Sequence, residues 1–180
     1  PYFVVTLLRH IIRLMKVNAQ DSLNLISKST FSRAFNASRV FRSYQTSRFL
    51  GRASLSGMPI SISVEPTTSC NLRCPECPSG LRSFTRPTGM LDPSLFRSVI
   101  DQLAPTLSYL TFYFQGEPFL NPQFLDMVKY ASQKGIYTAT STNAHFLNSD
   151  TALATVKSSL DRLIISIDGT TQKAYQSYRV

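Results

Sequence analysis

Tryptophan is absent from this chain of 180 residues, and charged residues and cysteines are few. Without tryptophan, the large apolar side chains of a packed core come from twelve phenylalanines and eight tyrosines. Charged residues make up 16% of the chain and apolar residues 43%, whereas globular proteins carry about 25% charged residues. This composition excludes an intrinsically disordered chain and collagen. The length allows one domain with a true core, or one domain and an additional arm.

Long hydrophobic segments are also missing. The apolar residues 1–8 are followed by Arg9, His10 and Arg13, so no run of about 20 apolar residues exists to cross a bilayer. No charged segment precedes residues 1–8 and no clear cleavage site follows them, which argues against a secretory peptide. Because the chain begins with Pro1 rather than Met, we expect it to be trimmed at its front. We expect a cytoplasmic protein, with the inner membrane surface as a further location.

Acidic residues are scarce in the first third of the chain, where nine basic residues accompany a single acid, Asp21. The net charge is +9, and residues 1–57 carry almost all of it. We therefore divide the chain into a basic helical arm or linker, 1–57, and a core domain, 58–180. Apolar residues recur at helical spacing in residues 1–17, which predicts a basic amphipathic helix. Such a helix either contacts an anionic membrane surface or packs on a partner domain, and the segment that follows it is compatible with short helices or a linker.

The core domain alternates between β-forming and helical segments. Strands are predicted at residues 60–65, 108–114, 136–142 and 162–168. Helices are predicted after Asp92-Pro93, after Asn121-Pro122 and over residues 149–158. Strands separated by helices of this length predict an α/β fold with a parallel sheet built from βα units.

All three cysteines, Cys70, Cys74 and Cys77, fall within eight residues, directly after the first predicted strand. An odd, clustered set is a poor disulfide framework and suits a metal or cluster site in a reducing compartment. The carboxyl end of a parallel strand is also where α/β proteins place their active sites. Structural zinc needs four protein ligands, and the two histidines, His10 and His145, are distant in sequence. Three thiolates fit a four-iron cluster better than zinc, because its fourth iron then stays open.

The cysteine motif resembles the signature of the radical S-adenosylmethionine (radical SAM) enzymes, which is Cys-x3-Cys-x2-Cys after a first strand. Its amino-acid sequence, CNLRCPEC, resembles that of the SPASM-type branch of the family, which includes peptide and sulfatase maturases. Further motifs end the next three strands, as in that family: QGEP at 115–118, STN at 141–143 and SIDG at 166–169. The resemblance covers residues 58–180 and implies the first four βα units of a partial TIM-type barrel, preceded by the basic helical arm. The chain then resembles an amino-terminal fragment, with later strands beyond Val180.

The resemblance also implies roles for individual residues. Cys70, Cys74 and Cys77 would bind a 4Fe–4S cluster whose open iron binds S-adenosylmethionine (SAM). The other implied cofactor-binding residues surround SAM: the backbone of Gln115 and Gly116 and the carboxylate of Glu117 at its amino group, Ser166 at the ribose or carboxylate, Arg179 at the carboxylate, and Asn143 and Asp168 as further candidates. Glu76 occupies the position before the last cysteine, where the family often has an aromatic residue near adenine.

In this family, one electron from the reduced cluster cleaves SAM, and the adenosyl radical abstracts a hydrogen atom from the substrate. The resemblance therefore implies an external one-electron reductant of the flavodoxin or ferredoxin type and a substrate that could be a peptide. An alternative from a different class is a non-catalytic metal-binding module that docks through the basic arm on membrane or nucleic acid. Nucleic acid ranks below membrane, because basic and aromatic residues do not interleave as in single-strand binders.

Overall fold

The computed structural model describes residues 19–180. The amphipathic helix expected within residues 1–17, and the membrane contact expected of it, lie outside the described residues. Four strands form one parallel sheet in the order β1-β2-β3-β4: β1 Ser61–Ser63, β2 Tyr109–Thr111, β3 Tyr137–Thr142 and β4 Arg162–Ile165. The predicted α/β fold with a parallel sheet is confirmed, although the strands are shorter than predicted at one or both ends.

Helices connect successive strands, as the alternating pattern predicts. The connecting helices are α4 Pro93–Leu103, α5 Phe124–Gln133 and α6 Ser149–Lys157, with shorter turns at α3 Pro78–Leu81, η1 Pro118–Leu120 and α7 Gln172–Gln176. Asp92 caps α4 by accepting from the Ser94 and Leu95 N–H groups, and Asn148 caps α6. The core lies between α4, α5 and the sheet and consists of Phe96, Ile100, Leu107, Leu110, Phe112, Phe124, Met127, Val128, Ala131 and Ile136.

The start of α5 differs from the prediction. We expected Asn121-Pro122 to cap this helix, but its N-cap is Gln123, without a side-chain cap hydrogen bond. The Asn121 side chain instead accepts from the Gln123 N–H at 2.9 Å and donates to the Pro66 carbonyl at 2.8 Å. Asn121 therefore ties the η1 turn to the segment after β1, a role that depends on a residue 55 positions away.

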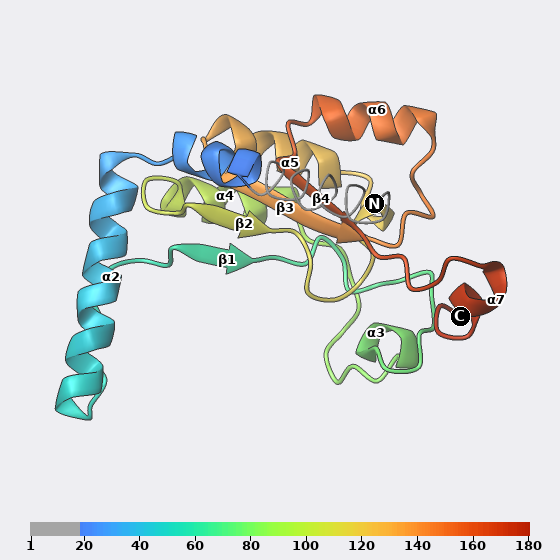
Figure 1. The fold of residues 1–180 in the computed structure, drawn as a ribbon, viewed down its shortest axis with the longest axis horizontal. Helices are drawn as coiled ribbons and strands as arrows, with labels where there is room; N and C mark the ends of the chain where they lie inside the picture. Colours follow the sequence, from blue (N-terminus) through green and yellow to red (C-terminus); the bar gives the residue numbers. More distant parts are fainter. Residues whose placement is uncertain (1–18) are drawn as a thin grey trace, which may run out of the picture.

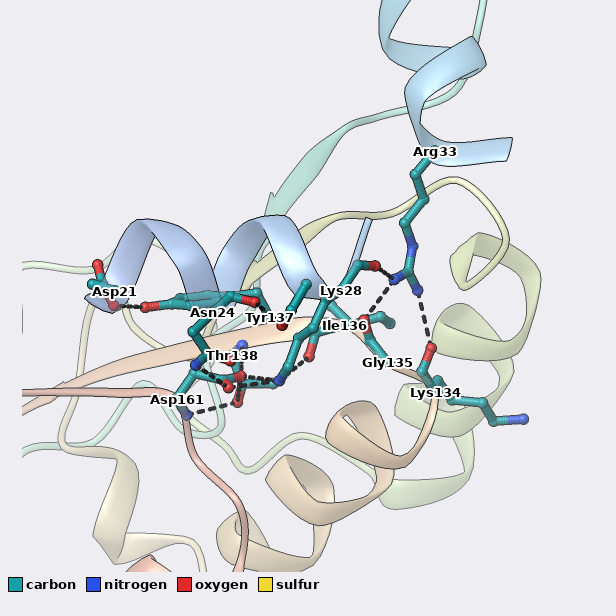
Figure 2. A network of polar contacts seen from close by, with 11 residues as sticks. Asp21, Asn24, Lys28, Arg33, Lys134, Gly135, Ile136, Tyr137, Thr138 and Asp161 are labelled. Atoms are coloured by element: carbon teal, nitrogen blue, oxygen red, sulfur yellow. Dashed lines mark hydrogen bonds and ion pairs between the residues drawn. The ribbon is translucent and has the colours of Figure 1, made fainter. Parts of the chain in front are cut away.

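The segment before the core, which the sequence left ambiguous between short helices and a linker, is largely helical over residues 19–50 and not helical over residues 51–57. Residues 19–27 form one helix, and α2 (Phe31–Leu50) forms a second, longer helix. Figure 2 shows how the first of these is fixed against the sheet: Lys28 Nζ lies 2.5 Å from Asp161, and Asn24 donates to the same carboxylate at 2.9 Å. Tyr137 also donates to Asp21. These contacts lie at the amino ends of β3 and β4.

Arg33 fixes the base of α2 at the same end of the sheet (Figure 2). Its side chain is buried, and its guanidinium donates to the carbonyl oxygens of Lys28, Ala104, Lys134 and Gly135 at 2.5–3.0 Å. The residues after α4 and α5 are thereby joined to the start of α2.

Among the described residues, no helix combines the length and apolarity that a membrane span requires.

Candidate metal and cofactor site

A pocket of about 150 Å³ lies at the carboxyl ends of the strands, at the end of the sheet where Figure 1 shows α3 and α7. Nine of the eleven residues predicted to bind metal or cofactor line it. They are Cys70, Cys74, Cys77, Gln115, Gly116, Glu117, Asn143, Ser166 and Arg179. The remaining two, Glu76 and Asp168, are not among its lining residues, and both are exposed.

The three cysteines are free thiols around this pocket, with Cys74 buried and the other two half-buried. Burial raises the pKa of the Cys70 thiol, and the Leu72 N–H, 3.5 Å from its sulfur, opposes that rise. Within residues 19–180, no three His, Cys, Asp or Glu side chains are arranged to hold a single metal ion. In a 4Fe–4S cluster each cysteine binds a different iron, so its ligands need not converge on one point.

Gly116 allows the cysteine loop to approach the end of β2. Its φ is 81°, and a Cβ at this position would lie 2.1 Å from the Thr67 carbonyl oxygen. The next residue, Glu117, donates its N–H to the Ser69 carbonyl at 2.8 Å. Only glycine has both the backbone freedom and the space for this contact, which explains its place in the QGEP motif.

Ser79 connects the cysteine loop to the QGEP segment from the other side. Its hydroxyl donates to Gln115 Oε1 at 2.8 Å and accepts from the Gly116 N–H at 3.0 Å. Cys77 Sγ lies 3.5 Å from the same Gln115 oxygen. The Gly116 N–H is therefore occupied, while no hydrogen bond within residues 19–180 uses the carbonyl oxygens of Gln115 or Gly116. Sequence reasoning missed Ser79, because its partner lies 36 residues away.

Glu117 is a buried carboxylate at the pocket wall, with 2% of its surface exposed. It accepts hydrogen bonds from Thr142 Oγ1 at 2.7 Å and from the Asn143 N–H at 2.9 Å. In the described part of the chain, no Lys, Arg or His forms an ion pair with it. A buried charge without a counter-ion is costly, so an ammonium group in the pocket would compensate this carboxylate.

Arg179 brings a guanidinium to the same pocket. Its Nη1 lies 3.8 Å from Cys74 Sγ, and its Nε donates to Asp168. Asp168 therefore contacts the pocket only through Arg179, whose direction it fixes. Ser166 also lines the pocket, and its Oγ is 3.1 Å from Ser141 Oγ.

Asn143 belongs to a polar network that joins the end of β3 to the cysteine loop. Its side chain donates to Asn71 Oδ1 at 2.9 Å, and Asn71 lies 3.0 Å from His145 Nδ1. His145 Nε2 in turn lies 2.9 Å from the Tyr175 hydroxyl, so the network reaches α7. His145 is exposed and lines no part of this pocket. Sequence analysis did not identify Asn71 or Tyr175 as part of the site.

The family model of the radical SAM superfamily matches residues 64–179. The chain belongs to the radical SAM superfamily. The cofactors of this superfamily are a 4Fe–4S cluster and SAM, and the pocket residues fit both. Three thiols are available for the cluster, and the uncompensated carboxylate of Glu117 and the guanidinium of Arg179 suit the ammonium and carboxylate groups of SAM.

Curated relatives of this radical SAM chain include enzymes with different names. It is 26% identical to an AdoMet-dependent heme synthase of Methanosarcina barkeri, 31% to a mycofactocin maturase of Mycobacterium ulcerans and 29% to a PqqA peptide cyclase of Rhodopseudomonas palustris. The matches cover 69%, 67% and 63% of this chain, and 36%, 32% and 30% of those proteins. The chain thus spans about a third of the length of these relatives.

Solved structures agree on the fold. The structure of Streptococcus suis SuiB bound to S-adenosylmethionine superposes with a TM-score of 0.58 and 16% sequence identity, covering 77% of this chain and 31% of SuiB. The partial TIM-type barrel of radical SAM enzymes is therefore confirmed as the fold class of the core.

Proposed function

We propose that Cys70, Cys74 and Cys77 bind a 4Fe–4S cluster, that SAM binds beside it, and that this chain is the cofactor-binding part of an enzyme that cleaves SAM reductively. The observation that carries the proposal is the composition of one pocket. Three thiols, a buried carboxylate that forms no ion pair within residues 19–180, and a guanidinium line the same small cavity at the strand ends.

Under this proposal, different residues of the pocket bind different groups of SAM. Glu117 binds the ammonium of SAM, together with the free carbonyl oxygens of Gln115 and Gly116. Arg179, oriented by Asp168, binds the carboxylate, and Ser166 binds the ribose or the carboxylate. When bound, the reduced cluster supplies the electron that breaks the bond between the sulfonium and the ribose carbon. The chain's own contribution is to position SAM and to exclude water from it.

The substrate we propose is a peptide. A relative named a PqqA peptide cyclase and another named a mycofactocin maturase support this choice, while the relative named a heme synthase supports a small-molecule substrate instead. We further propose that a flavodoxin- or ferredoxin-type protein in a reducing, cytoplasmic compartment supplies the electron. Contact of residues 1–17 with the inner membrane surface stays a prediction.

The non-catalytic metal-binding module is the less favoured alternative. A structural metal site needs ligands and a closed shell, but it needs no carboxylate and no guanidinium in a pocket beside the thiols. Glu117 and Arg179 therefore favour a cofactor with charged groups of its own.

Anaerobic reconstitution with iron and sulfide, followed by dithionite and SAM, tests the proposal. We expect a brown protein with broad absorbance, and 5′-deoxyadenosine and methionine as products by mass spectrometry. Cys70→Ser, Cys74→Ser and Cys77→Ser should each lose the absorbance and the products, whereas the control Ser69→Ala, beside the first ligand, should keep both. Colourless protein with tightly bound zinc would contradict the proposal.

A further inference from the structure

His145 lies outside the cofactor pocket, yet its ring joins two segments that line the pocket. Its Nδ1 is 3.0 Å from the side-chain amide of Asn71 in the cysteine loop, and its Nε2 is 2.9 Å from the Tyr175 hydroxyl on α7. The rings of His145 and Tyr175 also lie close together, with centroids 6.1 Å apart. The Tyr175 carbonyl in turn accepts from the Arg179 N–H at 2.8 Å. A single imidazole therefore connects the loop of the cysteines to the turn that carries the Arg179 guanidinium.

The backbone just before His145 has a conformation that alanine rarely adopts. Ala144 has a φ of 67°, in the left-handed region. At this turn the His145 N–H donates to Asn143 Oδ1 at 3.0 Å, while the Asn143 N–H donates to the Glu117 carboxylate at 2.9 Å. Such a backbone conformation persists where the surrounding contacts require it. The turn thus fixes His145 relative to the buried carboxylate of the pocket.

The directions of these hydrogen bonds all follow from one backbone N–H. Because the His145 N–H can only donate, Asn143 Oδ1 accepts from it, and the Asn143 amide nitrogen donates to Asn71 Oδ1 at 2.9 Å. The Asn71 amide nitrogen is then the donor to His145 Nδ1, so Nδ1 carries no proton. The neutral ring has its proton on Nε2 and donates it to the Tyr175 hydroxyl. The network therefore selects one tautomer of His145.

We propose that His145 is a positioning residue for SAM binding, because it holds α7 in the place where Arg179 reaches the pocket. The inference rests on the proposed function of that pocket. Helix α7 has only five residues, Gln172–Gln176, and a helix this short is not stable without outside contacts. If Tyr175 lost its contact with His145, SAM would have to order this segment as it binds, and its affinity would fall.

Two other contacts hold the same segment and limit the size of the effect. The Asp168 carboxylate accepts from Arg179, and the Val180 carbonyl accepts from the Arg73 N–H in the cysteine loop. Both contacts remain when His145 is replaced, so we expect weaker SAM binding rather than its loss. The His145 side chain is exposed, so its removal leaves no cavity in the core.

A SAM titration of the reconstituted cluster tests the inference. His145→Ala should weaken SAM binding by about tenfold, and Tyr175→Phe, which removes only a hydroxyl, by about threefold. The control Tyr178→Phe also removes a hydroxyl but keeps its ring 5.6 Å from the Arg179 guanidinium, and it should bind SAM as the wild type does. A wild-type chain that does not bind SAM would overturn the proposed function itself. Wild-type affinity in His145→Ala would overturn only the role of His145.

The rate of 5′-deoxyadenosine formation distinguishes positioning from a general loss of structure. At saturating SAM, His145→Ala should keep a maximal rate within about twofold of the wild type, since the lost contact acts on binding. Its KM for SAM should rise, and its iron content should stay the same. A lower maximal rate with unchanged SAM affinity would show a loss of folded enzyme and would contradict positioning.

A double-mutant cycle tests whether His145 acts through Tyr175. The double variant, His145→Ala with Tyr175→Phe, should bind SAM about tenfold more weakly than the wild type, as His145→Ala alone does, because the second change removes a contact that is already lost. Independent effects would multiply to about thirtyfold and would contradict the proposed link.

Nuclear magnetic resonance tests the tautomer directly, because the chain has only two histidines. In His10→Gln, long-range ¹H–¹⁵N spectra in mildly alkaline buffer, where imidazole is neutral, report on His145 alone. We expect the proton on Nε2. A proton on Nδ1 would overturn the network from which the inference is drawn.

Discussion

Glu117 is the residue whose surroundings most restrict what can occupy the pocket. It receives two hydrogen bonds from the end of β3 and no compensating cation within residues 19–180. A neutral ligand would leave this buried charge uncompensated. Under the proposed function, the amino group of SAM would supply the missing positive charge, and the carboxylate would then discriminate between ligands as well as bind one.

Replacing Glu117 with Gln should therefore weaken SAM binding by about tenfold or more, because the amide keeps its shape but loses its charge. Glu76→Gln removes the same charge from an exposed side chain outside the pocket and should leave the affinity unchanged. The measurement is a SAM titration of the reconstituted cluster, followed by its spectral change. If the two variants bind SAM equally, Glu117 is not the ammonium site.

Short motifs allowed most of the pocket residues to be predicted, because each lies directly after a strand of a parallel sheet. The neighbours that orient them could not be found this way. Ser79 and Asn71 owe their roles to partners at Gln115 and Asn143, which are distant in sequence. Asp168 was predicted to bind cofactor, but in the structure it accepts a hydrogen bond from Arg179 and does not line the pocket itself.

At the scale of elements, two loops must touch for the pocket to form. The cysteine loop and the turn after β2 meet where Gly116 lies against Thr67 and Ser69. Backbone contact of this kind leaves no room for a side chain, so the two loops are positioned as one unit.

Gly116→Ala should separate these loops, because its Cβ would overlap the Thr67 carbonyl and its φ of 81° disfavours alanine. We expect the free energy of unfolding to fall by about 2 kcal/mol or more, and the cluster yield to fall with it. Gly89→Ala is the matched control, since nothing lies within 4 Å of its added Cβ. Chemical denaturation and the iron content per chain measure the two effects. Equal stability of both variants would exclude close packing at Gly116.

At the other end of the sheet, Arg33 joins separate segments of the chain, as the contact at Gly116 does beside the pocket. Four carbonyl oxygens depend on its buried guanidinium, so Arg33→Gln should lower the free energy of unfolding by about 3 kcal/mol. Arg42→Gln, on the exposed part of α2, should change it by less than about 0.5 kcal/mol. Denaturant unfolding compares them, and a small effect at both positions would show that α2 is not anchored through Arg33.

The sequence predicted strands and helices better than it predicted the arm. Alternating β-forming and amphipathic segments reveal βα units directly, because the periodicity of each segment reflects burial in the core. Helix α2 gave no such signal, since its buried side chains, Arg33 and Asn36, are polar and its exposed face carries phenylalanines. Its burial is set by distant carbonyls rather than by an apolar stripe.

At the scale of the whole molecule, the described chain ends in an open sheet. In residues 19–180, β4 pairs only with β3. Ile165, the last residue of β4, and Ile167, two residues after it, are exposed. An unpaired strand edge with apolar side chains promotes association.

We expect the chain to self-associate in a concentration-dependent manner, and Ile165→Thr with Ile167→Thr to reduce this association while keeping a β-branched residue at both positions. Leu153→Thr, at an exposed position of α6, is the control and should have no effect. Sedimentation velocity distinguishes the outcomes, and a wild-type chain that stays monomeric at all concentrations would contradict the role of this edge.

The central claim is that three thiols hold a cluster with an open iron in contact with SAM. Electron paramagnetic resonance of the anaerobically reconstituted, dithionite-reduced chain tests it most directly. The account predicts a signal of a reduced 4Fe–4S cluster whose g-values change when SAM is added. A chain that gives no such signal, or a signal that SAM leaves unchanged, would contradict it.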